Sequence, residues 1–140
     1  MNHLRQTKRN CGQTCVAMIL GIKVELVEEA LHQKGGTYPE DLRMLLKASG
    51  YQPGPRNRQL LPGIPSIEMG VLRVRWKNDR GGHWIVLNGD QVLDPSCSAA
   101  MTREGYEGRL QLLEARVTEY FEIRKVEEKA EEQPKNTYAA

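Results

Sequence analysis

Three stretches near the start of the chain carry apolar side chains at helical spacing. Residues 11–20 are apolar beyond their first turn, and a segment that is apolar on all sides is typical of a helix at the centre of a fold. Residues 24–33 repeat apolar positions at helical spacing and stop before a pair of glycines. A third helix is expected from Thr37, its cap, up to Gly50, because Pro39 and two acidic residues suit its first turn.

The rest of the chain changes to the alternating, β-branched pattern of strands. Before the strands, residues 52–66 hold four of the seven prolines, which indicates a long irregular loop rather than a second domain. Such loops often form the wall of a binding site. Strands are predicted over residues 70–76, 83–88, 91–94 and 116–123, with a short helix near residues 107–114. Helices followed by an antiparallel sheet predict an α+β fold.

One domain accounts for almost the whole length. Residues 126–140 are mostly Glu, Lys, Gln, Pro, Asn and Ala without a core-forming pattern, which predicts a charged, disordered tail. Residues 1–125 are left as one domain, and a chain of 140 residues can bury a sufficient core without disulfides or metal ions.

Composition and charge give no indication of a nucleic-acid or membrane partner. Lys and Arg number 20 and Asp and Glu 18, a balance that does not predict binding to nucleic acid or to an anionic membrane. The longest apolar run, residues 15–20, is far shorter than the about 20 residues of a membrane helix. Lys23 and Glu25 follow where a signal peptide would have a cleavage site, so we expect a cytoplasmic protein.

Positive charge is concentrated in one segment. Residues 53–80 contain six basic and two acidic side chains. Within it Arg73 and Arg75 alternate with apolar neighbours, as on the solvent face of a half-buried strand. The alternative interpretation is a surface for an acidic or phosphate-bearing partner.

The cysteines provide the first candidate for chemistry, because three cysteines cannot all pair within one chain. Asn10 and Gln13 have the spacing of a capping box, which predicts a helix start that places Cys11 at the first helical position. Free N–H groups and the positive end of the helix dipole stabilise a thiolate there. Gly12 leaves room for a substrate backbone, whereas Cys15 is expected to pack in the core.

A thiolate nucleophile needs a base, and His83 is the best placed of three histidines. It opens a predicted strand directly after Gly82, whereas His3 and His32 lie in polar surroundings. Asn88-Gly89 predicts a two-residue hairpin turn.

A type I′ turn at that position sets the register of the hairpin. It pairs Leu87 with Asp90 and therefore places His83 directly opposite Asp94, close enough for the carboxylate to hold the imidazole. A three-residue turn would instead place Pro95 opposite His83. Donors for an oxyanion are also needed, and the backbone N–H of Cys11 and the side-chain amide of Gln6 are the candidates.

Three segments together resemble the papain-like cysteine peptidases. These are QTKRNCGQTCVAM over residues 6–18, HWIVL over residues 83–87 and VLDP over residues 92–95. The resemblance is closest to the bacterial double-glycine peptidases that process bacteriocin leader peptides, and to their stand-alone relatives. It implies a papain-like fold in which a central helix carries the cysteine and the N-terminal helices pack on a C-terminal antiparallel sheet.

The same resemblance implies roles for individual residues. Cys11 would be the nucleophile, His83 the general base and acid, and Asp94 the residue that orients it, with Gln6 and the Cys11 amide forming the oxyanion hole. Gly12, Gly82 and Trp84, which flank the nucleophile and the base, are the expected substrate-binding positions. Gln6 stands one residue closer to the cysteine than in the common family pattern, and Asn10 replaces the more usual Asp.

The expected function is hydrolysis of a peptide or isopeptide bond in a peptide or protein substrate, with no cofactor and no metal ion. Two alternatives belong to other classes. One is a catalytically inactive papain-like fold that serves as a binding module. The other is a zinc site built from Cys11, Cys15, His83 and Cys97, although two cysteines four residues apart in one helix are poorly spaced for it.

Overall fold

Four helices and one six-stranded antiparallel sheet make up the residues that the computed structural model describes, which are 1–7, 9–31, 38–77 and 82–126. The helices are α1 (Cys11–Leu20), α2 (Val24–Leu31), α3 (Pro39–Ala48) and α4 (Arg103–Leu112). The strands are β1 (Tyr51–Pro53), β2 (Met69–Arg75), β3 (His83–Asn88), β4 (Gln91–Leu93), β5 (Met101–Thr102) and β6 (Arg116–Lys125). This arrangement confirms the α+β fold predicted from the sequence.

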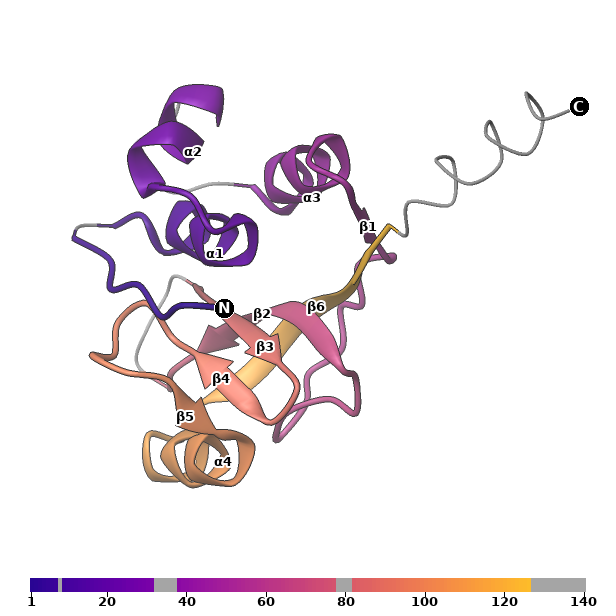
Figure 1. The fold of residues 1–140 in the computed structure, drawn as a ribbon. Coiled ribbons are helices and arrows are strands. Elements are labelled where there is room, and N and C mark those ends of the chain that lie inside the picture. Colours follow the sequence, from indigo (N-terminus) through magenta and orange to yellow (C-terminus); the bar gives the residue numbers. More distant parts are fainter. Residues whose placement is uncertain (8, 32–37, 78–81, 127–140) are drawn as a thin grey trace, which may run out of the picture.

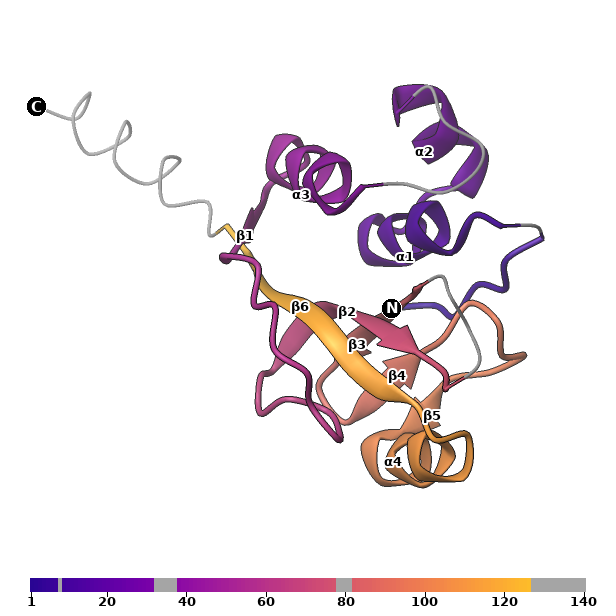
Figure 2. The same ribbon diagram turned by 180° about the vertical axis from the view of Figure 1, so that it is seen from behind.

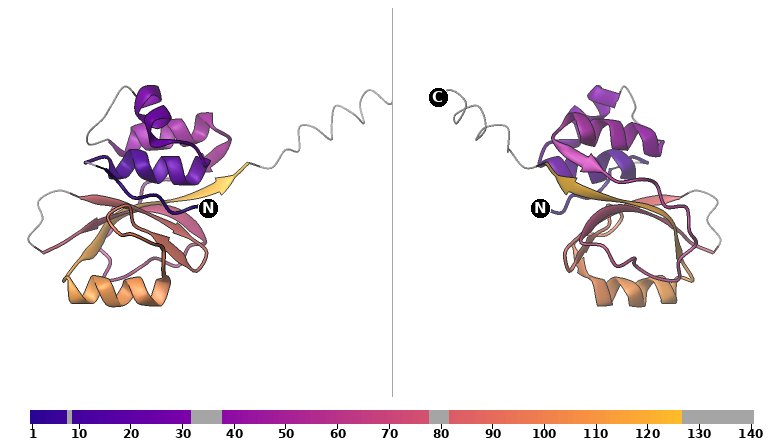
Figure 3. Two further views of the ribbon diagram at one scale, coloured as in Figure 1. Left: turned by 60° about the vertical axis from the view of Figure 1, so that its left-hand side comes forward. Right: turned by 90° about the vertical axis from the view of Figure 1, so that its right-hand side faces the viewer.

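The sheet divides the molecule into layers. Its strand order is β1-β6-β2-β3-β4-β5, so β6, the last strand of the chain, lies inside the sheet between β1 and β2. Helices α1, α2 and α3 cover one face and α4 lies against the other (Figures 1 and 2). The side views in Figure 3 show the same separation of the helices by the sheet.

Each face of the sheet has its own apolar cluster. Trp84 and Val86 of β3 pack with the buried residues of α1, whereas Ile85 and Leu87 face the other cluster, which includes Tyr106 of α4. Successive side chains of a strand point to opposite faces, and a strand covered on both faces must therefore be apolar throughout. This explains why β3 reads as a continuous apolar run in the sequence.

Helix α1 lies at the centre of the fold and has the predicted bounds. Every residue from 12 to 19 is buried, and the helix ends at Gly21, whose φ of 68° lies in the left-handed region that favours glycine. None of the described helices is long and apolar enough to cross a membrane.

The proline-rich loop is attached to the sheet. Its first residues form β1, which pairs with the end of β6 and was not predicted. Further along, Asn57 and Leu61 exchange backbone hydrogen bonds with Tyr120 and Val117 of β6. The loop therefore follows β6 along most of its length.

One predicted helix has different bounds in the structure. The short helix near residues 107–114 begins earlier, at Arg103, because the Thr102 hydroxyl accepts a hydrogen bond of 3.0 Å from the N–H of Gly105 and caps it. Helix α3 begins at Pro39 as expected, but its predicted cap, Thr37, lies outside the described residues. Almost all of the predicted tail, residues 127–140, also lies outside them.

The hairpin between β3 and β4 has a different register from the one predicted. Leu87 pairs with Val92 rather than with Asp90. Gly89, with a φ of 60°, is the first central residue of the two-residue turn, as in a type II′ turn, whereas the type I′ prediction placed Asn88 there. The Asn-Gly pair thus ends β3 and begins the turn instead of forming its centre.

A shift of two residues keeps each side chain on the same face of the sheet. Asp94, one residue beyond β4, is therefore not directly opposite His83 but lies diagonally from it on the same face. The prediction of a directly opposed pair was wrong, yet the two side chains still meet.

Candidate active site

The first residue of α1 and the first residue of β3 come together at one end of the sheet. The thiol of Cys11 is hydrogen bonded to the side chain of His83. Its sulfur also accepts the backbone N–H of Trp84, with an N to Sγ distance of 3.5 Å, and the N–H of Gly12. The fold thus surrounds one sulfur atom with an imidazole and two backbone donors.

The imidazole of His83 is held from its other side by Asp94. Nε2 of His83 donates to Oδ1 of Asp94 at 2.5 Å, which leaves Nδ1 as the ring nitrogen that faces Cys11. His83 is 8% exposed and Asp94 is 1% exposed, so water scarcely reaches this hydrogen bond. The order of groups is therefore thiol, imidazole, carboxylate.

Two further residues hold the carboxylate in place. The hydroxyl of Tyr106 on α4 donates to Oδ2 of Asp94 at 2.6 Å. Ser96 donates to Oδ1 from its backbone N–H at 2.8 Å and from its hydroxyl at 2.7 Å. Sequence reasoning missed both residues, since a tyrosine on the apolar side of a helix reads as a core residue. For Ser96, the position two residues after an aspartate is a common turn pattern and was the available signal.

These contacts change the acidity of the pair. Burial alone would raise the pKa of the Cys11 thiol, but the hydrogen bonds from His83, Trp84 and Gly12 outweigh it, and the pKa lies below its ordinary value. Burial alone would lower the pKa of His83, but the hydrogen bonds and charges of Asp94 and Cys11 raise it to about 9. Both shifts favour a thiolate beside an imidazolium.

The acidities of the surrounding groups follow from the same charges. Burial would raise the pKa of Asp94, but His83, Tyr106 and Ser96 hold it well below its usual range, so the carboxylate stays charged. Burial and the negative charge of Asp94 raise the pKa of the Tyr106 hydroxyl, which remains a donor.

The other two cysteines differ from Cys11 in acidity. The thiol of Cys15 is fully buried in the core, and burial raises its pKa far above the ordinary value. Burial and Asp94 raise the pKa of Cys97 as well. All three cysteines are free thiols, and Cys11 alone among them has a lowered pKa.

The predicted capping box is absent. Helix α1 begins at Cys11 as expected, but the side chain of Asn10 makes no capping hydrogen bond, and its amide is buried without a hydrogen-bond partner in the described part of the chain. The hydroxyl of Thr14 donates instead to the carbonyl oxygen of Asn10 at 2.8 Å. Asn10 has a φ of −126° and a ψ of 37°, so its backbone does not have the extended conformation of a capping residue.

The N-terminal segment lies along the residues that follow Asp94. The backbone N–H of Gln6 donates to the carbonyl of Pro95 at 2.8 Å, and Nε2 of His3 donates to that of Cys97, also at 2.8 Å. The side-chain oxygen of Gln6 is buried and has no hydrogen-bond partner among the described residues. Gln6 therefore reaches the neighbourhood of the triad, with its side-chain carbonyl not engaged elsewhere.

Two of the three predicted substrate-binding positions, Gly12 and Trp84, lie beside the Cys11 sulfur, and both are buried. Gly12 and Trp84 are covered by the core, so only their backbone groups face the Cys11 sulfur. The space beside Gly82 is filled by Arg73, whose side chain a Cβ at that position would overlap. The guanidinium of Arg73 in turn lies over the Trp84 ring, with Cζ 5.6 Å from the ring centroid.

Metal ligation was the basis of one alternative. Among the described residues, no three side chains of His, Cys, Asp or Glu gather where they could hold a metal ion. Cys11, Cys15, His83 and Cys97, the four proposed zinc ligands, are all described. Cys15 is buried in the core, and the carbonyl of Cys97 is bonded to His3. These four residues do not form a zinc site here.

Comparison with known proteins adds no family assignment. The chain matches no family model, and it finds no match among curated proteins. The functional argument therefore depends on the geometry of the site itself.

Proposed function

We propose that this protein is a cysteine hydrolase that cleaves a peptide or isopeptide bond. The observation that carries the proposal is the continuous chain of hydrogen bonds from Cys11 through His83 to Asp94, with the pKa of the thiol lowered and that of the imidazole raised. A nucleophile with an adjacent base that is itself oriented by a third group is the arrangement required for acyl transfer.

The reaction follows from the charge state of the pair. The Cys11 thiolate attacks the carbonyl carbon, and the carbonyl oxygen takes the negative charge. The imidazolium of His83 gives its Nδ1 proton to the leaving amine as the C–N bond breaks, which leaves a thioester on Cys11. His83 then removes a proton from water, whose hydroxide attacks the thioester. This releases the acid and regenerates the Cys11 thiolate beside the imidazolium of His83.

Asp94 holds the imidazole during both steps. Its hydrogen bond to Nε2 keeps Nδ1 directed at the sulfur and stabilises the imidazolium. Because Tyr106 and Ser96 occupy its other hydrogen-bonding positions, the carboxylate cannot rotate without losing several bonds at once. We assign both residues positioning roles.

The developing oxyanion needs donors near the first turn of α1. The backbone N–H of Cys11 lies at the positive end of this helix, where N–H groups lack helical partners. The side-chain amide of Gln6 is the second proposed donor, supported by the backbone hydrogen bond that ties Gln6 to Pro95.

The proposal extends to fold family and compartment. The α+β arrangement, with a cysteine at the start of a central helix and a histidine on the facing sheet, supports a papain-like fold. Three free thiols suit a reducing compartment such as the cytoplasm.

A peptide library tests this function without knowledge of the natural substrate. Peptides made by digesting a whole proteome are incubated with the wild-type protein, and new termini are counted by mass spectrometry. We expect cleavage by the wild type and by Cys97→Ala, and a loss of about 10⁴-fold or more in Cys11→Ala. Cys97→Ala is the matched control because it also removes a partly exposed thiol.

Two results would contradict the proposal. Equal cleavage by Cys11→Ala would show that another group performs the chemistry. Failure of the wild type to cleave, together with a Cys11 that reacts with iodoacetamide no faster than Cys97, would show that the cysteine is not activated. A folded Cys11→Ala variant that retains the biological effect of the protein would favour the binding-module alternative.

A further inference from the structure

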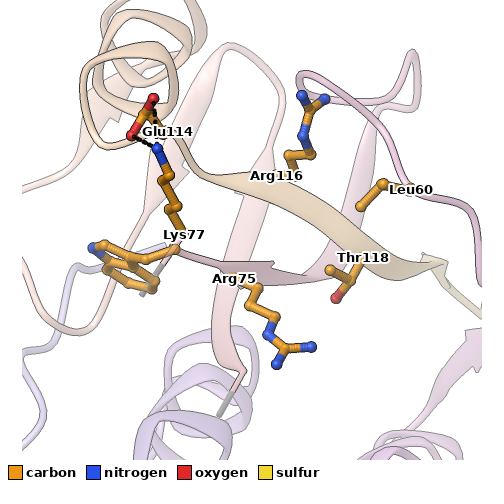
Figure 4. Close-up of a pocket in the computed structure, with 7 residues that line it drawn as sticks. Leu60, Arg75, Lys77, Glu114, Arg116 and Thr118 are labelled. Atoms are coloured by element: carbon orange, nitrogen blue, oxygen red, sulfur yellow. Dashed lines mark hydrogen bonds and ion pairs between the residues drawn. The ribbon is translucent and has the colours of Figure 1, made fainter. Parts of the chain in front are cut away.

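A basic pocket lies at the end of β2 and β6. Its volume is about 450 Å³, large enough for one or two amino-acid side chains. It is lined by Leu60, Arg75, Trp76, Lys77, Glu114, Arg116 and Thr118 (Figure 4). The proposed mechanism uses none of these residues.

The charge of the pocket is predominantly positive. Arg75 and Arg116 are paired positions on β2 and β6, and Figure 4 shows their guanidinium groups extending in opposite directions. Within the described part of the chain, nothing forms an ion pair or hydrogen bond with the guanidinium of Arg116. The guanidinium of Arg116 is therefore available to bind an anionic group.

The acidic residue of the pocket does not neutralise it. Glu114 pairs with Lys77 at 3.2 Å, and Figure 4 shows the two side chains turned toward each other. Their side chains are 64% and 65% exposed, and a pair so exposed to water contributes little free energy. Lys77 can therefore exchange this partner for a ligand at small cost.

Trp76 connects the pocket to the candidate active site. Its ring meets the ring of His83 edge to face, with centroids 5.4 Å apart and planes at 71°. The same residue lines the pocket, so the two sites share one side chain as a wall. A substrate bound across His83 can extend past Trp76 into the pocket.

We propose that this pocket binds an acidic side chain of the substrate and thereby selects peptides with Asp or Glu close to the cleaved bond. The inference rests on the proposed function, since it names the substrate class of that site. An indole ring separates the pocket from His83, and an extended peptide spans about 3.4 Å per residue. The acidic residue therefore falls within about three residues of the cleaved bond.

An acidic peptide fits the pocket better than a nucleic acid does. Glu114 lines the pocket with its negative charge, and the single aromatic residue of the pocket, Trp76, already packs on His83. Single-stranded nucleic acids need a basic groove along several phosphates together with free aromatic faces for stacking. A side-chain carboxylate needs only one or two guanidinium or ammonium donors.

Binding can be measured without catalysis. The Cys11→Ala protein, labelled with ¹⁵N, is titrated with acetyl-Gly-Glu-Glu-Gly-amide and with the matching glutamine peptide. The chain has two tryptophans, and only Trp76 lines the pocket, so the indole N–H signal of Trp76 reports on the pocket. We expect the Trp76 signal to shift with the glutamate peptide, at about tenfold higher affinity than with the glutamine peptide.

Substitutions locate the binding. Arg116→Gln, made in the same background, should weaken the glutamate peptide about tenfold. Arg124→Gln removes the same charge from the same strand outside the pocket and should leave the affinity within about twofold. Equal affinity for the two peptides, equal effects of the two variants, or tighter binding of an oligothymidine would each overturn the proposal.

The cleavage experiment separates this inference from the proposed function. In the peptide library, Asp and Glu should be enriched within three residues of the cut for the wild type and lose that enrichment in Arg116→Gln. Cleavage without enrichment of Asp and Glu would contradict the proposed substrate preference and still support the peptidase function. Binding of the glutamate peptide at Trp76 without any cleavage would support the acidic-residue pocket and contradict the peptidase function.

Discussion

The hydroxyl of Tyr106 donates a 2.6 Å hydrogen bond to Oδ2 of Asp94, while Oδ1 of the same carboxylate accepts from His83. Tyr106 belongs to α4, on the opposite face of the sheet from the helix that carries Cys11. Both layers of helices therefore contribute to the candidate site. Helix α1 carries Cys11, and Tyr106 of α4 holds the carboxylate of Asp94.

Replacing Tyr106 by Phe removes this donor and little else. A buried carboxylate that loses one hydrogen bond is destabilised, and we expect the free energy of unfolding to fall by about 1–3 kcal/mol in urea denaturation. With one fewer bond to its charged form, Asp94 should lose part of the downward shift of its pKa. The catalytic rate should decrease more than KM changes, because the residue acts through Asp94.

The matched comparison is Tyr120→Phe, because Tyr120 is a partly buried tyrosine that packs against the same apolar cluster as Tyr106. A merely structural role for Tyr106 would lower stability without moving the pH profile of cleavage. Equal pH profiles for the wild type and Tyr106→Phe would therefore contradict a positioning role.

Asp94→Asn should act on the imidazole rather than on the fold alone. The amide cannot supply the negative charge that raises the pKa of His83 to about 9, so that pKa should fall toward about 6.5. Cleavage should decrease about 10²–10⁴-fold. An NMR titration of the His83 ring measures the pKa directly, and an unchanged value in the variant would show that Asp94 is not its partner.

Stability should depend on pH in a way that identifies the thiol–imidazole pair. A raised His83 pKa means that the folded protein holds a proton between about pH 6.5 and 9 that the unfolded chain has lost, so stability falls over this window as pH rises. A lowered Cys11 pKa has the opposite sign, since the folded protein releases the thiol proton before the unfolded chain does.

The two contributions partly cancel in the wild type. Removal of Cys11 also lowers the pKa of His83, since Cys11 is one of the groups that raise it. From about pH 6.5 up to that lower pKa, urea unfolding should therefore show a steeper loss of stability in Cys11→Ala than in the wild type. The single group left in Cys11→Ala gives a slope of up to about 1.4 kcal/mol per pH unit. Parallel curves for the two proteins would mean that the thiol is not ionised ahead of its ordinary pKa.

Much of the site could be predicted from the sequence because its residues lie on strongly patterned elements. The apolar run of α1 and the continuous apolar strand β3 fix where Cys11 and His83 begin their elements. Asp94 was predicted through an incorrect register, and the prediction of a contact survived because the error was an even number of residues. An even shift of the register keeps Asp94 on the same face of the sheet as His83, whichever turn type connects the strands.

The remaining features depend on contacts between segments that are distant in sequence. Strands β1 and β5 have three and two residues, too few to show alternation, and they form because partner strands lie beside them. The support of Asp94 by Tyr106 requires α4 to pack under the hairpin. The side chain of Asn10 makes no capping hydrogen bond, and its burial is likewise set by the surrounding core.

The pH dependence of alkylation by iodoacetamide tests the central claim most directly, since it reports the ionisation of each thiol in the intact protein. Mass spectrometry measures the rates at Cys11 and Cys97 in the same sample between pH 5 and 10. The account predicts a midpoint for Cys11 below that of Cys97 and an upward shift of the Cys11 midpoint in His83→Ala, because the hydrogen bond from His83 lowers the pKa of the thiol. A Cys11 midpoint equal to that of Cys97, or unchanged in His83→Ala, would contradict it.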